Sequence, residues 1–460
     1  MATQQTPSGP RGLPLVGNTH QWARDPNGFR ERCAAEYGPV TNFEMLGWDT
    51  YMVTDPDEIE RILVSESERF PKHSDSNSEL KEIVGDGLIT SQGDLWERQR
   101  EAIQPAFYMD HIREYADIMV SRSEEAAERW RAGEEIEVRE EMTRLTLEIL
   151  VDAMFGRDID IEERGIYEAV EAFQKPMRPA YQPITFFAPD WTPLPFLRRA
   201  NRAHEHLHEQ IDDIVDQRRA RRTALRSERA GDAREQAGRD ADRDDLLSML
   251  LDADTEMSDE QIRDEMMTFL FAGHETTALT LTFLWDLLSR NAGARERLHA
   301  ELDATLDGRP TIEDVFELDY TKAVVKEAMR LYPPAHEIRR EPVEDVEIAG
   351  YSVPEGSLLV LPTWVMHRDA RFWAHPEQFR PERWLDGEGP ETDRPDFAYF
   401  PFGGGPRHCI GHRFAMTEAQ LVVATLASRW ELERQYDDLG VSAAVTLQPD
   451  GDVTMVPRPR

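Results

Sequence analysis

The sequence contains few cysteines and no long apolar run. Cys33 and Cys409 are its two cysteines, and two cysteines cannot form the disulfide framework of a secreted protein, so we expect a reducing compartment. No run of about 18 apolar residues occurs that would span a bilayer, and the first residues lack the basic and apolar regions of a signal peptide. These absences predict a cytoplasmic protein without a membrane span.

Lysine is also scarce. Five lysines accompany 89 acidic residues, and the formal net charge is −36. A chain with this charge lacks the basic surface that binds phosphate groups, so we expect no nucleic acid partner. Strong self-repulsion is tolerated where counterions screen it. We therefore expect the cytoplasm of a halophile, with an ordinary acidic protein as the alternative.

What the sequence does contain favours helices. Apolar residues make up 40% and charged residues 31% of the chain, which is typical of a globular protein, and amphipathic stretches with helical spacing recur. We expect a mainly α fold with a smaller β-rich region. The expected arrangement is one domain over 1–460, with β-rich parts at about 37–70 and 340–366, a helical core at about 93–335 and 367–435, and a C-terminal hairpin at about 440–457.

Local signals predict where this helical pattern is interrupted. The polar, glycine-spaced segment 72–91 is interpreted as a long loop. A proline- and aromatic-rich connection is expected at 177–196, and a charged linker at 226–245.

Strand signals predict two hairpins. The runs VEIAGYSV and SLLVLPTWV are expected to pair around the turn at 354–356. The run VTLQPDGDVTMV, at 445–456, is expected to form a second hairpin at the end of the chain.

Cys409 lies between a glycine-rich turn and a predicted helix, in the stretch YFPFGGGPRHCIGHRFA. Near a helix N-terminus free amides stabilise an anion, and Arg407 adds positive charge, so we expect a thiolate, which is either a nucleophile or a metal ligand. A nucleophile needs a base, and the adjacent His408 and His412 do not by themselves provide that geometry. A zinc site needs further nearby ligands. The glycine run lacks the Lys-Ser/Thr ending of a phosphate loop.

A single thiolate without a second protein ligand suits an iron whose other ligands come from a macrocycle. Five positions follow the pattern F-x-x-G-x-R-x-C-x-G, namely Phe402, Gly405, Arg407, Cys409 and Gly411. This pattern resembles the haem-binding signature of the cytochrome P450 monooxygenases. The resemblance implies haem b (iron protoporphyrin IX) with Cys409 as iron ligand, Arg407 at a propionate, and Gly405 and Gly411 giving clearance. It also implies a triangular helical prism with a long distal helix over the haem.

The segment AGHETT, at 272–277, lies in the most hydrophobic helical stretch. Position 278 is alanine, so this is not a zinc-protease motif, and consecutive polar side chains in an apolar helix require partners. The segment is similar to the family's distal motif A-G-x-[D/E]-T-T, where the helix opens over the haem. The resemblance implies that Ala272 and Gly273 lie at the haem, that Gly273 leaves room for dioxygen, and that Glu275 and Thr276 organise a proton path. Hydrogen bonding within the helix is the alternative.

The segment KEAMR places Glu327 and Arg330 on one helix face, and Arg383 in FRPERW is in a position to join them. A solvated ion pair is the alternative from these residues alone. Together the two segments resemble the family's E-x-x-R and P-E-R elements. That resemblance implies a buried structural network that supports the cysteine loop.

Two further elements resemble propionate-binding positions of the family. WERQR sets Trp96 and Arg100 four residues apart, on one helix face; a surface stacking pair is the alternative. Arg340 aligns with another propionate partner, with Arg339 one position away as the alternative. His336 and Glu337 depart from the apolar residues that many relatives carry there, which argues against a purely hydrocarbon-lined pocket at that point.

The resemblance implies a monooxygenase that inserts one atom of O2 into a C–H or C=C bond and reduces the other to water. Because the chain ends soon after the haem helix and its hairpin, we expect a separate electron donor, a ferredoxin or flavodoxin with its reductase. The expected docking patch comprises Arg98, His412 and Arg413.

We expect a lipophilic substrate such as a fatty acid, carotenoid or other terpenoid. The expected pocket segments are 79–89, 173–196, 269–276, 335–338 and 444–446, with the aromatics Phe173, Tyr181, Phe186, Phe187 and Phe269.

Two other functions stay open. A haem-thiolate sensor or binding protein would need the cysteine but not AGHETT. A peroxide-driven haem enzyme would need neither the redox partner nor the threonine relay.

Overall fold

The computed structural model describes residues 6–45, 47–157, 159–177, 194–229, 245–252, 257–385 and 394–460. The α-helices are α1 (Thr19–Arg24), α2 (Pro26–Tyr37), α3 (Pro56–Glu60), α4 (Ser74–Val84), α5 (Gly93–Ile103), α6 (Met109–Arg129), α7 (Val138–Phe155), α8 (Ile166–Gln174), α10 (Pro195–Arg229), α11 (Leu246–Asp252), α12 (Asp259–Arg290), α13 (Ala292–Thr305), α14 (Asp319–Leu331), α15 (Thr363–Met366) and α16 (His412–Ala427). The expectation of a mainly helical fold is confirmed.

The strands form four small sheets. They are β1 (Val40–Met45), β2 (Trp48–Val53), β3 (Ile136–Glu137), β4 (Ile338–Arg340), β5 (Val346–Ile348), β6 (Tyr351–Val353), β7 (Leu358–Leu361), β8 (Trp430–Arg434), β9 (Val441–Ala443), β10 (Leu447–Pro449) and β11 (Thr454–Pro459). The largest sheet has the order β1-β2-β7-β4. Its inner strand β7 is buried along its whole length, which explains its unbroken apolar sequence.

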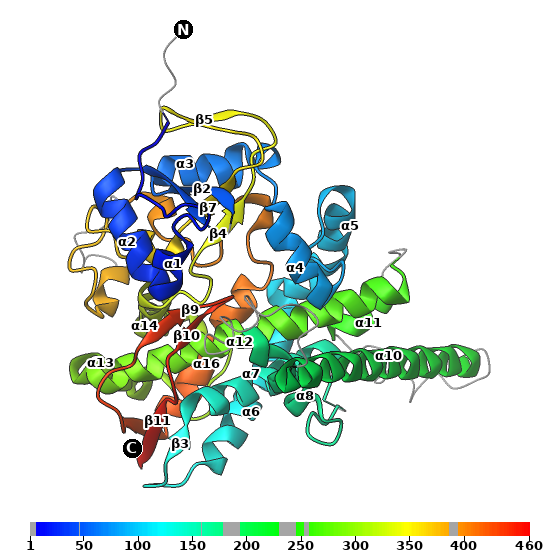
Figure 1. Cartoon of the computed structure of the whole chain (residues 1–460). Helices are drawn as coiled ribbons and strands as arrows, with labels where there is room; N and C mark the ends of the chain where they lie inside the picture. Colours follow the sequence, from blue (N-terminus) through cyan, green and yellow to red (C-terminus); the bar gives the residue numbers. More distant parts are fainter. Residues whose placement is uncertain are drawn as a thin grey trace.

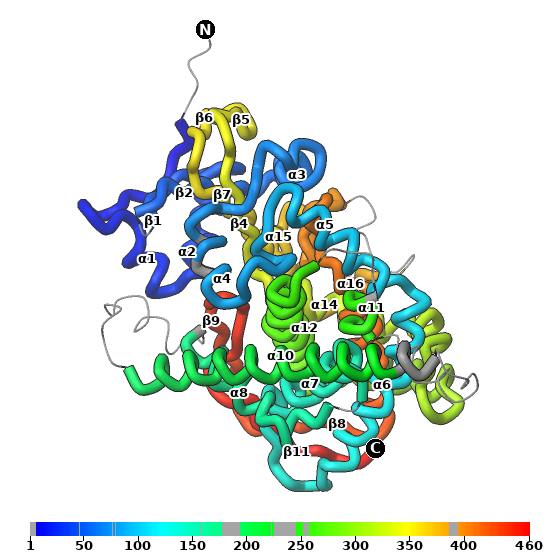
Figure 2. The backbone as a smooth tube through the Cα atoms, turned by 90° about the vertical axis from the view of Figure 1, so that its right-hand side faces the viewer, coloured from blue at the N-terminus to red at the C-terminus, as the bar shows by residue number. Residues whose placement is uncertain are grey.

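The sheet and the helices occupy different ends of the molecule. Figure 1 shows β2, β7 and β4 with α1 to α3 at one end and the long helices at the other. In Figure 2, α10 runs across the helical part, and helices α7, α10, α14 and α16 pack against α12. Helix α12 has 32 residues and begins with a capping box between Ser258 and Gln261, which satisfies amides of its first turn.

Three local predictions were wrong. The segment 72–91 is not a continuous loop, because it contains α4. Leu80, Ile83 and Val84 recur at helical spacing and join the hydrophobic cluster that includes residues of α12, so tertiary packing stabilises a helix in a polar sequence.

Both predicted hairpins pair differently. Strand β5 turns directly into β6 at Ala349 and Gly350, which both have positive φ, as a two-residue hairpin requires; β7 instead pairs with β2 and β4. At the end of the chain, β10 pairs with β9. Strand β11 pairs with β8 and β3, because the longer register with β8 joins more residues than a local hairpin would.

The two expected interruptions of the helices fall mostly outside the described residues. The described part of α10 extends to Arg229, so the beginning of the expected linker at 226–245 is helical. Cys33 is 2% exposed in a core cluster with Phe29 and Phe43, and burial raises the pKa of its thiol to about 12, in keeping with an inert core cysteine.

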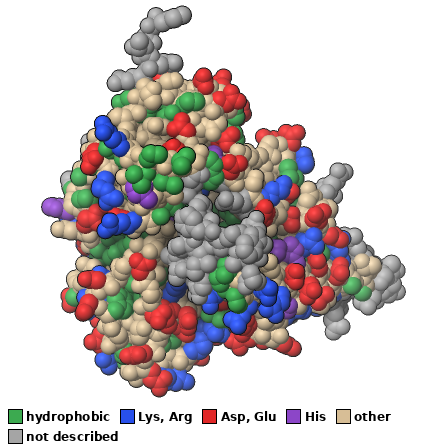
Figure 3. All heavy atoms as spheres, in the orientation of Figure 1, with side chains coloured by type: hydrophobic (Ala, Val, Ile, Leu, Met, Phe, Trp, Pro, Cys, Tyr) green, Lys and Arg blue, Asp and Glu red, His purple; other side chains and the backbone are tan. Residues whose placement is uncertain are grey.

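Acidic side chains are spread over the face drawn in Figure 3. None of the helices in the described ranges is both long enough and apolar enough to cross a bilayer. The halophilic origin stays a prediction.

The predicted set of Glu327, Arg330 and Arg383 is brought together in a buried network. The Glu327 carboxylate accepts hydrogen bonds from Arg330 Nε (2.9 Å) and Nη2 (2.8 Å) and from Arg383 Nε (2.9 Å). It also accepts from the Arg380 amide (3.0 Å) and Trp384 Nε1 (2.9 Å). The side chains of the three ionised groups are at most 2% exposed, so this is not a solvated ion pair.

The network reaches the cysteine loop through His367. Arg330 Nη1 donates to the His367 carbonyl oxygen (2.8 Å), and the Phe400 amide donates to His367 Nε2 (3.0 Å). Phe400 lies at the start of the loop that carries Cys409. Helix α14 and this loop are therefore held by one chain of buried hydrogen bonds.

We expect Glu327→Gln to lower the free energy of unfolding by about 3–5 kcal/mol, because it leaves two buried guanidinium groups without a counter-charge. The matched control is Glu433→Gln, which breaks an exposed pair with Arg458 and is expected to change the free energy of unfolding by less than about 1 kcal/mol. Urea unfolding of both variants measures the difference. Equal losses would contradict the structural role of the network.

Candidate functional site

Cys409 lies in a tightly turned loop before α16. The Cys409 amide donates to the Phe402 carbonyl oxygen (2.9 Å), and the His408 amide donates to that of Gly405 (3.0 Å). Gly405 has a φ of +65°, and a Cβ atom there would lie 2.0 Å from the Leu63 carbonyl oxygen. Glycine is therefore required because the loop closely approaches the π-helical turn η1 (Arg61–Ser65). The sequence predicted glycine here as clearance for a macrocycle and did not predict this contact within the protein.

A Cβ atom at Gly411 would meet only Phe107 Cε1, at 3.7 Å. Gly411 is the N-cap of α16, with a φ of −84°. Neither protein packing nor backbone conformation demands glycine at this position, so the predicted clearance stays a prediction.

The Cys409 thiol is enclosed by protein, yet its side chain has solvent-accessible surface, so it faces an internal space. Burial raises its pKa, while the Gly411 amide and the Arg100 charge lower it in part. The prediction of a favoured thiolate is thus wrong for the protein alone, because desolvation outweighs the amide and the cation. The cation that acts on the sulfur is Arg100 rather than Arg407. A metal ion would supply the charge that keeps the sulfur ionised.

Four cations gather in the segments around this loop. Arg100 Nη1 donates to the His408 carbonyl oxygen (2.9 Å), and Arg407 Nη1 to that of Ser91 (2.9 Å). Arg340 Nη1 donates to the Arg339 carbonyl oxygen (2.8 Å), and Lys72 Nζ to that of Ile89. Within the described ranges, none of the four forms an ion pair with a carboxylate.

Burial and mutual repulsion act on the charges of these side chains. Burial, together with Arg407 and Arg340, lowers the pKa of Lys72 to about 6. Burial lowers the pKa of Arg340 to about 10. Burial, Arg340 and Arg100 lower the pKa of Arg407 to about 10. Cations that are buried together without a counter-charge create a site for an anion.

Trp96 lies in this group, and the alternative of a stacking pair between Trp96 and Arg100 is not found. The Arg407 guanidinium carbon lies 3.9 Å from the centroid of the Trp96 ring. Arg100, four residues after Trp96, instead donates to Gln104 Oε1 (2.9 Å) and to His408. Lys72 was missed by the sequence analysis; its isolation in a lysine-poor chain was the only available signal.

The structure distinguishes Arg339 from Arg340. Arg339 Nε donates to Glu337 Oε1 (2.7 Å), and Glu337 also pairs with Arg30. Burial alone would raise the pKa of Glu337, but Arg30 and Arg339 hold it well below its usual range. Arg339 is therefore neutralised within the protein, whereas Arg340 is not. His336 Nε2 lies 2.8 Å from the Ala444 carbonyl oxygen. The two polar residues that depart from the apolar family pattern, His336 and Glu337, therefore both have partners within the protein.

One face of α12 opens to an internal space. Between Asp264 and Leu288 the side chains are buried, except for four that are partly accessible: Ala272, Gly273, Glu275 and Thr276. Their spacing places them on one helix face. These are the four distal positions that the sequence analysis selected. A surface of this kind in the middle of a buried helix marks the wall of a cavity.

Helix α12 is continuous through these positions, so the expected local opening is not present. Thr276 Oγ1 donates to the Ala272 carbonyl oxygen (3.1 Å), the common back-bond of a helical threonine. A Cβ atom at Gly273 would lie 2.9 Å from Leu150 Cδ2. Glycine therefore also permits the close approach of α7.

Glu275 is held by a residue that the sequence analysis missed. Gln448 Nε2 of β10 donates to Glu275 Oε1 (3.0 Å), and Arg139 Nη2 donates to Gln448 Oε1 (3.1 Å). Gln448 is 1% exposed. It lies 173 residues from Glu275, so no local pattern could have paired them.

The segment between α4 and α5 is fastened to α12 by two carboxyl groups. Asp264 Oδ2 accepts from the Asp86 amide (2.8 Å), and Glu265 Oε2 accepts from the Leu88 amide (3.0 Å). Of the predicted pocket aromatics, Phe173 stacks on His204 and Phe269 on Phe107. Tyr181, Phe186 and Phe187 lie outside the described residues.

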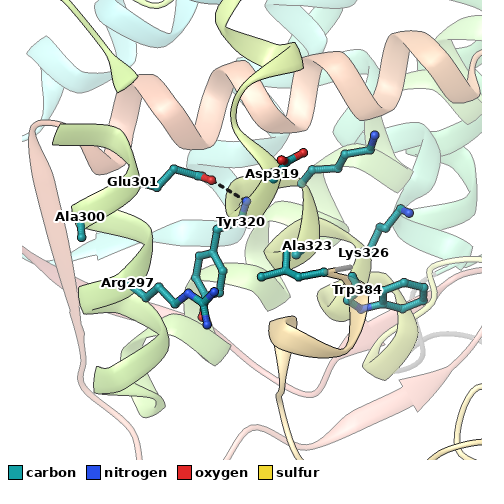
Figure 4. Close-up of a pocket in the computed structure, with 10 residues that line it drawn as sticks. Arg297, Ala300, Glu301, Asp319, Tyr320, Ala323, Lys326 and Trp384 are labelled. Carbon is teal, nitrogen blue, oxygen red and sulfur yellow. Dashed lines mark hydrogen bonds between the residues drawn. The ribbon is translucent and has the colours of Figure 1, made fainter. Parts of the chain in front are cut away.

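A separate cavity of about 700 Å³ lies between α13, α14 and the short helix η6 (Pro381–Trp384). Figure 4 shows Lys326 beside Trp384, and the Glu301 carboxylate accepting from the Tyr320 amide. None of the predicted site residues lines this cavity. It is therefore distinct from the space at Cys409.

The comparisons with known proteins agree with this geometry. The cytochrome P450 family profile matches residues 7–449. Cyclooctatin synthase of Streptomyces melanosporofaciens is 34% identical over 98% of this chain and 95% of its own length. Pentalenene oxygenase of Streptomyces avermitilis is 30% identical over 97% of this chain and 93% of its own length. The crystal structure of a cytochrome P450DA haem domain has a TM-score of 0.83 at 25% identity, covering 99% of this chain and 98% of that one.

The accessible thiol of Cys409, and the group of four cations that reaches it through Arg100, are the features expected of a haem site. The chain belongs to the cytochrome P450 family and is a cytochrome P450 monooxygenase. The family binds a haem-thiolate cofactor and acts with O2, a substrate and a redox partner. The residues present fit that cofactor, because Cys409 faces an internal space and four nearby cations lack carboxylate partners among the described residues.

Glu265 gives a pH prediction. Burial raises the pKa of Glu265 to about 8, although the Leu88 amide opposes the shift. Between the ordinary carboxyl pKa and about 8, the unfolded chain loses this proton while the folded chain keeps it. Stability therefore falls as pH rises through that window. Glutamine keeps an acceptor for Leu88 and cannot ionise, so Glu265→Gln is expected to gain stability relative to wild type as pH rises.

The measurement is the free energy of unfolding of both proteins from about pH 5 to about pH 8. Glu260→Gln, an exposed change in the first turn of the same helix, is the control and should run parallel to wild type. A Glu265→Gln curve that also ran parallel would contradict a protonated Glu265.

Proposed function

We propose that this monooxygenase uses haem b, bound through Cys409, and oxygenates a lipophilic terpenoid-type molecule with electrons from a separate protein. The observation that carries this proposal is the accessible thiol of Cys409 beside Lys72, Arg100, Arg340 and Arg407. Two propionates would neutralise these cations. When bound, the haem supplies the iron at which dioxygen is activated.

The residues around Cys409 would hold the cofactor. Cys409 Sγ would ligate the iron, and the Gly411 amide and Arg100 would stabilise its negative charge. Arg340 and Arg407 would bind propionate oxygens through donors that the described residues leave without a carboxylate, with the Trp96 ring centroid 3.9 Å from the Arg407 guanidinium carbon. The pairing of Arg339 with Glu337 favours Arg340 over Arg339 in this role.

Glu275 and Thr276 would transfer protons on the α12 side of the site. The reaction consumes two protons for each water formed, and both side chains lie on the accessible face of α12. Thr276 Oγ1 gives its own hydrogen to the Ala272 carbonyl oxygen, so its lone pairs remain available to accept a hydrogen bond from water. Glu275 Oε1 is anchored by Gln448. Buried apolar neighbours on α12 exclude bulk water.

Two kinds of observation favour a lipophilic substrate. Apolar residues of the predicted pocket segments, including Leu88, Ile89, Phe269 and Ala272, belong to one hydrophobic cluster. The relatives include a pentalenene oxygenase and a cyclooctat-9-en-7-ol 5-monooxygenase, names that denote unsaturated hydrocarbon skeletons. A carotenoid remains within the proposal, since LUTEIN DEFICIENT 5 of Arabidopsis thaliana is 31% identical over 86% of this chain.

The proposed electron donor is a ferredoxin or flavodoxin, docking beside the start of α16. Arg98 and Arg413 are exposed there. Burial, with Arg413 and Arg100, lowers the pKa of His412, so this ring adds little charge at neutral pH. The two arginines carry the attraction for an acidic donor.

The test of the cofactor assignment is the absorption spectrum of the reduced, CO-bound protein. Wild type should show the large red shift of the Soret band that thiolate ligation causes, and Cys409→Ser should lack it. A wild-type band without the shift would defeat the proposal. Product analysis with pentalenene, which binds with a type I spectral shift in the expected case, then tests the substrate class.

Thr276→Ala distinguishes the proposed monooxygenase from a haem-thiolate sensor and from a peroxide-driven enzyme. For the proposed reaction, product formed per reducing equivalent should fall by about tenfold or more while the CO spectrum stays unchanged. A sensor, or an enzyme driven by hydrogen peroxide alone, would be unaffected by this substitution.

Arg413→Glu tests the docking surface. Reversing this exposed charge should slow electron transfer from an acidic donor by about three- to tenfold at low ionic strength, with the difference shrinking as salt rises. Stopped-flow reduction measures the rate. Arg24→Glu makes the same change in charge at an exposed position on α1 and should leave the rate unaltered. Equal rates for the two variants would refute docking at Arg413.

A further inference from the structure

Two histidines of α10 approach each other away from the cysteine site. His204 and His208 are four residues apart, on one helix face, and their Nε2 atoms lie 3.0 Å apart. His204 Nε2 also lies 2.9 Å from the carbonyl oxygen of Ile83. Ile83 is in the last turn of α4, where carbonyl groups have no partner within the helix. Three atoms with lone pairs therefore meet between α10 and the end of α4.

One hydrogen atom can satisfy these three atoms only if it is shared between two bonds. If His204 Nε2 carries the proton, that one hydrogen must serve both His208 Nε2 and the Ile83 oxygen. If His208 Nε2 carries it, the lone pair of His204 Nε2 faces the lone pairs of Ile83. A cation would satisfy all three lone pairs together, since a neutral imidazole nitrogen and a carbonyl oxygen are both electron donors.

The surroundings keep the rings available as ligands. Phe173 stacks on the His204 ring at a centroid distance of 5.3 Å and an interplanar angle of 19°, which fixes the orientation of that ring. Asp212 is bound to Arg263 (2.9 Å), so it is not a third side-chain ligand.

The distances suit a divalent transition metal. Zinc binds imidazole nitrogen at about 2.0–2.1 Å in a tetrahedral arrangement, which places two ligand nitrogens roughly 3.3 Å apart. Imidazole ligands suit zinc, copper and nickel. Groups of three His, Cys, Asp or Glu side chains that could hold a metal ion do not occur in the described ranges. The remaining ligands here would be the carbonyl oxygen and water.

We propose that His204 Nε2, His208 Nε2 and the carbonyl oxygen of Ile83 form a binding site for one divalent ion of the zinc type. The ion joins α10 to the end of α4. The segment that follows α4 is already fastened to α12 through Asp264 and Glu265. Metal binding therefore restrains the α4–α5 segment from a second side, independently of the haem site.

The first test measures Zn2+ affinity of the chelator-treated full-length protein by isothermal titration calorimetry. We expect one site that is weakened by about tenfold or more in His204→Gln and in His208→Gln. His206→Gln is the matched control: His206 is on the same helix and its Nε2 lies 2.8 Å from the Arg164 carbonyl oxygen, away from the pair. Unchanged affinity in the first two variants, or an equal loss in His206→Gln, would overturn the proposal.

A second test uses the wild-type protein, so it does not depend on how the variants fold. Zinc X-ray absorption should show two imidazole nitrogens at about 2.0–2.1 Å, and saturation with Zn2+ should slow amide hydrogen exchange in residues 81–88. His208→Gln, which leaves the contact between His204 and Ile83 in place, should abolish the slowing. A zinc signal without imidazole ligands, or unchanged exchange, would contradict the proposed site.

Discussion

The buried carboxylate of Glu327 is the constraint on which the site depends. A desolvated carboxylate is tolerated only where donors surround it, and here five hydrogen bonds from Arg330, Arg380, Arg383 and Trp384 do so. Those donors come from α14 and from the segment that contains η6. Through Arg330 and His367 the same network reaches Phe400. The loop of Cys409 thus takes its position from charges that are satisfied within the protein.

The opposite arrangement surrounds the proposed haem. Lys72, Arg100, Arg340 and Arg407 are brought together with carbonyl oxygens as acceptors but without carboxylates in the described ranges. Burial lowers the pKa of all four side chains, and repulsion by neighbouring arginines lowers those of Lys72 and Arg407 further, which is unfavourable until an anion is present. The molecule contains more than enough acidic residues to neutralise them. In a chain of net charge −36, none of the described acidic residues forms an ion pair with these four cations, although Glu97 acts on Arg407 at longer range. This supports the proposal of an external anion.

Sequence spacing predicted much of the site, because its functional faces are local. Ala272, Gly273, Glu275 and Thr276 share a helix face by their spacing alone, and the structure shows these four as the accessible positions within a buried stretch of α12. The pairing of Glu327 with Arg330 is equally local. Long-range partners were not predictable: Gln448 at Glu275, Arg407 at Trp96 and Lys72 among the arginines come from segments far apart in the chain. The two misassigned hairpins failed for the same reason.

The sequence by itself determined the family and the helical class, since both rest on residue types at short fixed spacings. Only the tertiary structure decided the state of the charges. Arg339 is paired with Glu337, whereas Arg340 has no carboxylate partner among the described residues. Burial raises the pKa of Cys409. Packing into the hydrophobic cluster shared with α12 stabilises α4 as a helix. Burial and distance set the energy of a charge, and neither is encoded in the local order of residues.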